Sequence, residues 1–175
     1  SINDPYSLSD NAIYSLCKDR EGGIWIGSYF GGINYYPRFY TNFEKYYPKG
    51  TDKGLHGKRV REFCQDNQGI LWIGTEDGGL NRFNPKTKTF SFFTPSNAFT
   101  NVHGLCLVDD NLWVGTFSKG VKVVDTRTGA IVKTYQKTDS PRSLIDNSVF
   151  SICRTTTGDI YLGTLFGLLR YNRQS

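Results

Sequence analysis

Four cysteines and two histidines are the candidate nucleophiles and metal ligands of this chain. Each cysteine lies seven or eight residues before a large aromatic residue, so all four occupy one slot of a repeated pattern. Equivalent slots of stacked sheets lie on the order of 10 Å apart, which is farther than a disulfide allows. We therefore interpret them as small buried hydrophobic residues of inner strands, a setting that suits neither a reactive thiolate nor a metal site. They are Cys17, Cys64, Cys106 and Cys153.

A second set of residues combines aromatic rings with charged groups. Flat apolar faces can stack on a ligand, and bidentate polar groups can bind its oxygen atoms. These residues lie in loops and linkers that we expect to emerge on one rim of the molecule. The alternative is that the rings cover a neighbouring sheet and the charges are solvated. The predicted ligand-binding residues are Tyr29, Phe30, Arg59, Arg61, Glu76, Asp77, His103 and Phe117.

Catalytic groups are sparse, and no catalytic residue, metal site or cofactor is predicted. A lyase would need a base beside a cation, and His103 with Arg61 is the one pair that fits this description. Asp19, Asp66 and Asp109 recur at turns, which favour aspartate for their own backbone bonding. No Gly-rich segment follows a strand and opens a helix, so the glycine pairs are interpreted as turn devices and not as phosphate cradles.

The elements that position these residues form a repeat. An aromatic anchor returns at intervals of 47, 41 and 48 residues, each time within a short β-type run. Such a period is typical of β-propellers, in which each blade is one antiparallel sheet. The sequence therefore predicts an all-β fold, a β-propeller fragment of four consecutive four-stranded antiparallel blades with the last one incomplete. The anchors, expected to pack between neighbouring sheets, are Trp25, Trp72, Trp113 and Tyr161.

We expect one partial propeller domain over residues 1–175, with blades at about 11–47, 58–93, 101–135 and 147–175. Residues 43–47, 90–93 and 131–135 are the predicted fourth strands of the first three blades. The fourth repeat ends after its third strand, which leaves an edge and a sheet face open. Because such surfaces associate readily, we expect a homodimer or end-to-end association, or contact with remaining blades of a longer parent chain.

Composition argues against two other kinds of partner. The net charge is +5, and the Lys and Arg residues are scattered singly. A nucleic-acid surface would need a basic patch, so no nucleic acid is expected for this segment. The chain has no run of eighteen apolar residues, so no membrane contact is expected either.

The repeat resembles a known family. Residues 66–85 match the two-component regulator propeller repeat almost residue for residue, from the Asp turn through Leu-Trp-Ile-Gly-Thr to Arg-Phe-Asn-Pro. Residues 19–37 are similar, with Tyr36 before the final proline. Residues 109–125 and 155–172 are looser, since Lys119 and Phe166 replace the first glycine of the pair and Tyr161 replaces the tryptophan.

The resemblance implies a sensor. Such repeats form the periplasmic sensor part of bacterial hybrid two-component histidine kinases, many of which detect oligosaccharides and control glycan-utilisation genes. The segment itself would then be no enzyme, and the kinase would lie elsewhere in the parent chain. Two alternatives remain open, namely a propeller-scaffold carbohydrate-active lyase or hydrolase, and a protein-docking propeller.

Overall fold

The structure, a computed structural model, describes residues 7–38, 43–50, 54–92 and 96–172. They form fourteen β-strands, one short 3-10 helix and no α-helix, and none of them forms a helix long and apolar enough to span a membrane. The strands make four antiparallel sheets of three or four strands, which confirms the all-β propeller class. The chain divides into two compact units, residues 1–45 and 46–175.

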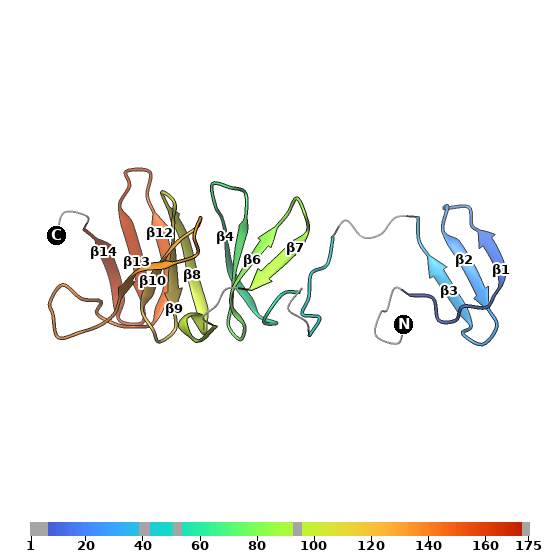
Figure 1. Cartoon of the computed structure of the whole chain (residues 1–175), viewed down its shortest axis with the longest axis horizontal. Helices are drawn as coiled ribbons and strands as arrows, with labels where there is room; N and C mark the ends of the chain where they lie inside the picture. The colour runs from blue at the N-terminus through green and yellow to red at the C-terminus, as the bar shows by residue number, and fades with distance from the viewer. Residues whose placement is uncertain (1–6, 39–42, 51–53, 93–95, 173–175) are drawn as a thin grey trace. The chain divides into compact units, whose positions relative to one another are not determined.

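The first unit holds one sheet, in the order β1-β2-β3 (Figure 1). Its strands are β1 (Ile13–Lys18), β2 (Ile24–Ser28) and β3 (Ile33–Tyr36). The prediction of a fourth strand over 43–47 was wrong, because those residues adopt no strand conformation. Tyr46 instead belongs to the second unit, where its ring lies 4.7 Å from Phe83 and 5.7 Å from Phe90. Aromatic packing therefore outweighs the strand propensity of this segment.

The second unit holds three sheets, with strand orders β4-β5-β6-β7, β8-β9-β10-β11 and β12-β13-β14 (Figure 1). The first two sheets are joined through the 3-10 helix η1 (Ser96–Phe99). The strands of the three sheets are β4 (Val60–Gln65), β5 (Leu71–Thr75), β6 (Gly79–Asn84), β7 (Thr89–Phe92), β8 (Val102–Val108), β9 (Asn111–Thr116), β10 (Val121–Asp125), β11 (Ile131–Tyr135), β12 (Val149–Arg154), β13 (Ile160–Thr164) and β14 (Gly167–Tyr171).

The core of the second unit lies between successive sheets. One cluster, which includes Trp72, Leu80 and Val114, fills the space between the β4–β7 and β8–β11 sheets. A second cluster, which includes Trp113 and Leu162, fills the space between the β8–β11 and β12–β14 sheets. Two anchors therefore pack as the sequence predicts.

The other two anchors do not reach this burial. Trp25 is 43% exposed and lies against the ring of Tyr35 at 4.4 Å. Tyr161 is half-buried, because no further sheet within the described residues of the second unit covers its face of the β12–β14 sheet. A single sheet cannot bury a side chain on a face that has no neighbour.

The cysteines lie in β1, β4, β8 and β12, one in each first strand, and all four are free. The prediction that they are buried is wrong for Cys17 and Cys153, which are exposed. Cys64 and Cys106 are half-buried against the two core clusters. Burial raises the pKa of both these thiols, so they stay protonated near neutral pH.

Candidate functional site

Each first strand contains a β-bulge at its second residue. The pairing register shifts between residues 13 and 15, 60 and 62, 102 and 104, and 149 and 151. A bulge re-aims the side chain of the extra residue and is common beside binding sites. We call these four positions the bulge residues: Tyr14, Arg61, His103 and Phe150.

A loop residue accompanies each bulge residue. It directly follows the second strand of its sheet, and its N–H donates to the carbonyl of the residue just before the first strand, at 3.0 to 3.1 Å in all four sheets. This repeated backbone bond fixes the loop beside the bulge. The four loop residues are Tyr29, Glu76, Phe117 and Leu165.

In the β4–β7 sheet the pair is ionic. Glu76 lies between two arginines, with Oε1 3.3 Å from Arg61 Nη1 and Oε2 3.1 Å from Arg59 Nη1. Exposed ion pairs contribute only about 0–1 kcal/mol each to stability. The Glu76 carboxylate thus bridges two guanidinium groups without adding much stability. Because each guanidinium has five N–H donors, most of these donors can still bind a ligand.

Asp77 binds the backbone of the segment that carries Arg59. Its Oδ1 accepts hydrogen bonds from the N–H groups of Lys58 at 2.9 Å and Arg59 at 3.3 Å. These bonds, the one from Arg59 first, hold the pKa of the Asp77 carboxyl below its ordinary value. Asp77 thus fixes the linker to the loop and positions Arg59.

In the β8–β11 sheet the pair is aromatic. The His103 ring centroid lies 5.9 Å from that of Phe117 and 5.3 Å from that of Phe150, which comes from β12. His103 Nδ1 is buried and has no hydrogen-bond partner among the described residues. Burial, then the positive charge of Arg61, lowers the pKa of His103, against the opposing effect of Glu76. The imidazole is therefore neutral near pH 7 and can donate and accept.

In the first unit the pair is Tyr14 and Tyr29, whose ring centroids lie 4.9 Å apart. Phe30 follows with 87% of its surface exposed, and its N–H donates to Asp10 Oδ2 at 3.0 Å. The two predicted site residues of this unit, Tyr29 and Phe30, thus lie together in the loop after β2, beside the bulge residue Tyr14.

The second unit brings most of the predicted ligand residues together, in a group that we call the rim cluster. Sequence analysis missed one member, Phe150. Its slot matches that of His103, since each follows the first valine of its strand, and alignment of the four first strands would have found it. In the described part of the chain, no three His, Cys, Asp or Glu side chains gather closely enough to hold a metal ion. The rim cluster consists of Arg59, Arg61, Glu76, Asp77, His103, Phe117 and Phe150.

Two segments of the chain match a protein family, the two component regulator propeller, over residues 7–30 and 54–77. Each matched range includes the first two strands of a sheet with its bulge residue, and the loop residue after them. Comparison with curated proteins gives no match.

Solved propeller structures are similar to the chain over most of its length. The extracellular domain of the hybrid two component system BT4673 from B. thetaiotaomicron has 25% identity and a TM-score of 0.63 over 93% of this chain. That of BT3049 from the same organism has 24% identity and a TM-score of 0.59 over 97%. PorZ, a surface component of the type-IX secretion system of Porphyromonas gingivalis, shares the fold, with 17% identity and a TM-score of 0.56 over 93%.

This chain spans only 20%, 24% and 25% of the length of those three chains. The family match falls on the two repeats that the sequence pattern also singles out, and the shared fold extends over all four sheets. The chain has a β-propeller fold in which residues 7–30 and 54–77 match the two component regulator propeller, and it is similar to the extracellular domain of a hybrid two component system.

Proposed function

We propose that this chain is a ligand-sensing propeller segment of a periplasmic sensor domain, and that it binds an oligosaccharide at the end of the sheets where the bulge residues lie. One observation carries the proposal: every sheet repeats the same bulge and the same loop contact, while the side chains at these positions differ. A constant backbone that presents variable side chains suits recognition better than it suits packing.

The side chains fit sugar chemistry. Phe117, 45% exposed, offers a flat face for a sugar ring, and the half-buried Phe150 stands edge-on to it with the ring centroids 6.1 Å apart. Arg59 and Arg61 offer paired N–H donors for hydroxyl or carboxylate oxygens. Lys58, Arg59 and Arg61 outnumber Glu76 and Asp77 in this region, so it favours neutral or acidic sugars over basic ones.

In this proposal the chain binds without turnover, and signalling belongs to a parent histidine kinase. The four sheets would be consecutive blades of one larger propeller, whose remaining blades complete the ligand site. An enzyme would instead use His103 as a base beside Arg61, since the neutral imidazole can accept a proton.

The test is calorimetry on the sensor domain that contains this chain, with a panel of neutral and acidic glycan fragments. We expect Arg61→Ala to weaken binding by about 1–3 kcal/mol, because a ligand oxygen loses its charged partner. Arg127→Ala is the matched control: Arg127 is also exposed and paired, with Asp125 Oδ2 at 3.6 Å, but it lies away from the rim cluster on the β10–β11 turn.

Three results would count against the proposal. If no glycan of either charge class binds the domain, the ligand class is wrong. If Arg61→Ala and Arg127→Ala behave alike, the rim cluster is not the site. If chromatography of the incubated glycans shows shorter products over time, the enzyme reading replaces the sensor reading.

A further inference from the structure

One member of the rim cluster, Glu76, lies where an anionic group of a ligand would bind. Its Oε2 is 3.1 Å from Arg59 Nη1 and its Oε1 is 3.3 Å from Arg61 Nη1, so each carboxylate oxygen contacts one guanidinium group. A carboxylate therefore fits between the two arginines. Guanidinium groups bind carboxylates most strongly through two parallel N–H···O bonds, whereas the described residues give Glu76 one such bond, from Arg59 Nη1.

The neighbouring acid, Asp77, is held in a different way. Its Oδ1 accepts hydrogen bonds from two backbone N–H groups, those of Lys58 and Arg59, which fix the linker. Within the described residues, the Glu76 carboxylate has only the two arginine side chains as hydrogen-bond and ion-pair partners. Because exposed ion pairs are weak, a ligand can displace the Glu76 carboxylate at little cost while Asp77 keeps the linker in place.

The groups around Glu76 match the parts of an acidic sugar. Burial, then the charge of Arg61, lowers the pKa of His103 and the charge of Glu76 raises it, so the imidazole lies close to both charged groups. His103 Nδ1 is buried without a partner among the described residues, which leaves Nε2 as the nitrogen that can bind a ligand. The exposed ring of Phe117 lies 5.9 Å from the imidazole. A uronic acid offers a carboxylate to the arginines, hydroxyls to the imidazole and an apolar face to the phenyl ring.

We infer that Glu76 determines the ligand specificity of the rim cluster: its carboxylate occupies the anion position, and the ligand is an oligosaccharide with a uronic acid whose carboxylate displaces it. The proposed function underlies this specificity, since the rim cluster must bind a sugar before Glu76 can select one. A uronic acid exchanges one carboxylate for another and keeps the charges of Arg59 and Arg61 balanced. A neutral sugar has no group that can replace Glu76.

The test is calorimetry on the sensor domain that contains this chain, with a galacturonic acid tetrasaccharide and a tetrasaccharide that contains glucuronic acid. Each is paired with its carboxyl-reduced form, in which a primary alcohol replaces the carboxylate. In at least one pair we expect the acidic member to bind more tightly than the reduced member. Glu76→Gln should tighten the acidic member roughly three- to tenfold, because no internal carboxylate then competes with the ligand, and should leave the reduced member unchanged.

A double variant shows whether this gain acts through the arginines. In the presence of Arg61→Ala, Glu76→Gln should lose most of its effect, because the ligand carboxylate then lacks one of the two guanidinium groups for which it competes. The double-mutant cycle on the two affinities should therefore show a coupling between Glu76 and Arg61 for the acidic member alone.

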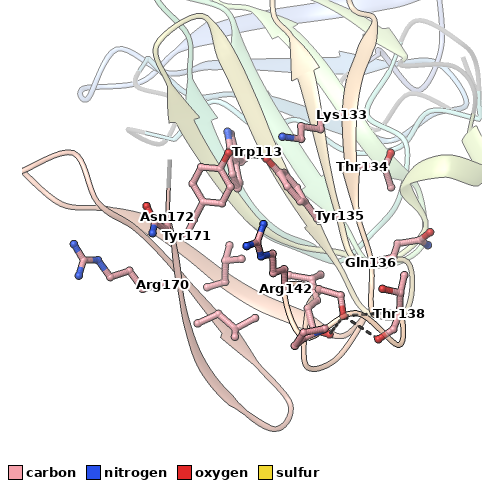
Figure 2. Close-up of a pocket in the computed structure, with 15 residues that line it drawn as sticks. Trp113, Lys133, Thr134, Tyr135, Gln136, Thr138, Arg142, Arg170, Tyr171 and Asn172 are labelled. Carbon is pink, nitrogen blue, oxygen red and sulfur yellow. Dashed lines mark hydrogen bonds between the residues drawn. The ribbon is translucent and has the colours of Figure 1, made fainter. Parts of the chain in front are cut away.

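Asp159→Asn is the matched control, because it also removes one negative charge from an ion pair with an exposed arginine. Asp159 Oδ1 lies 2.7 Å from Arg170 Nη2. Figure 2 shows Arg170 at a cavity of about 620 Å³, and none of the fifteen residues that line this cavity belongs to the rim cluster. The affinities for both members of each pair should stay the same in this variant.

We would abandon this role of Glu76 if Glu76→Gln weakened the acidic member, since Glu76 would then only hold the arginines in place, or if it changed both members alike. The same holds if the gain persisted in full with Arg61→Ala or if Asp159→Asn reproduced it. Tighter binding of a sulfated neutral tetrasaccharide than of both uronic acids would assign the anion position to sulfate instead. Binding of reduced glycans without binding of acidic ones would overturn the uronic acid alone, whereas a domain that binds no glycan would overturn the proposed function with it.

Discussion

At the scale of single residues, one aspartate performs two tasks. Asp66 Oδ1 accepts from the N–H groups of Gln68 and Ile70, each at 2.9 Å, and Oδ2 accepts from the Trp72 indole N–H at 2.8 Å. Asp19 makes the same set of bonds, with Trp25 as the indole donor at 3.0 Å. The recurring aspartate is therefore more than a turn former, because it also accepts the indole N–H of the anchor, which is buried in Trp72.

Replacement of this aspartate should be costly where the anchor is buried. We expect Asp66→Ala to lower the free energy of unfolding by about 2–4 kcal/mol, because three hydrogen bonds to a carboxylate are lost and an indole N–H is left unpaired in the core. Urea denaturation followed by circular dichroism measures this. Asp125→Ala is the control, since Asp125 accepts from the turn N–H groups of Arg127 and Thr128 and pairs with the Arg127 side chain, but bonds no indole N–H. Equal losses in the two variants would show that the indole bond has no special weight.

At the scale of elements, the glycines of the second strands β5 and β9 reflect contact between sheets. A Cβ added to Gly74 would lie 2.4 Å from Val102 Cγ1, in the first strand of the next sheet. At Gly115 the equivalent contact is Val149 Cγ1 at 3.0 Å. These glycines admit the following sheet, and the sheets could not approach as closely with any larger residue.

Gly74→Ala tests this contact. We expect a loss of about 1–3 kcal/mol in stability, since the β-branched Val102 has little freedom to move away from an added methyl group. The double variant Gly74→Ala with Val102→Ala should recover part of that loss, which a double-mutant cycle on denaturation midpoints would reveal as a coupling energy. Strict additivity of the two single changes would contradict the steric explanation.

At the scale of the whole molecule, the β12–β14 sheet exposes a face that its neighbours bury. Leu168 is 70% exposed, whereas its register equivalents Leu80 and Val121 are 1% and 0% exposed beneath the next sheet. Phe166 and Leu165 extend the exposed apolar surface. In the β4–β7 and β8–β11 sheets the equivalent face is covered by the next sheet. The exposed face of the β12–β14 sheet is therefore suited to contact with a second copy of the chain.

We therefore expect this chain to self-associate, with a weight-average mass that rises with concentration in sedimentation velocity. Leu168→Asp should shift the chain toward monomer, because a buried carboxylate would be unpaired in the contact. Val132→Asp, at an exposed apolar residue of β11, is the control and should associate as before. A monomer at all concentrations would rule out this contact.

The sequence by itself determined the strands other than the one expected over 43–47, the anchor spacing and the cysteine slot. These features are local and repeated: Asp66 and Gly69 close a turn through bonds within five residues, and alternation sets the side-chain faces. Six predicted ligand residues lie in one cluster for the same reason. Residues at equivalent positions of successive repeats lie at the same end of successive sheets.

Only the tertiary structure decided what depends on a neighbour. It buried Trp72 and Trp113 between successive sheets of the second unit and left Tyr161 half-buried on the outer face of the β12–β14 sheet of that unit, because burial needs a second sheet and the anchor alone cannot supply one. It turned Phe150 toward His103 through a bulge that no single-strand pattern shows. It also kept 43–47 out of a strand, since Tyr46 gained aromatic partners from β6 and β7, far along the chain.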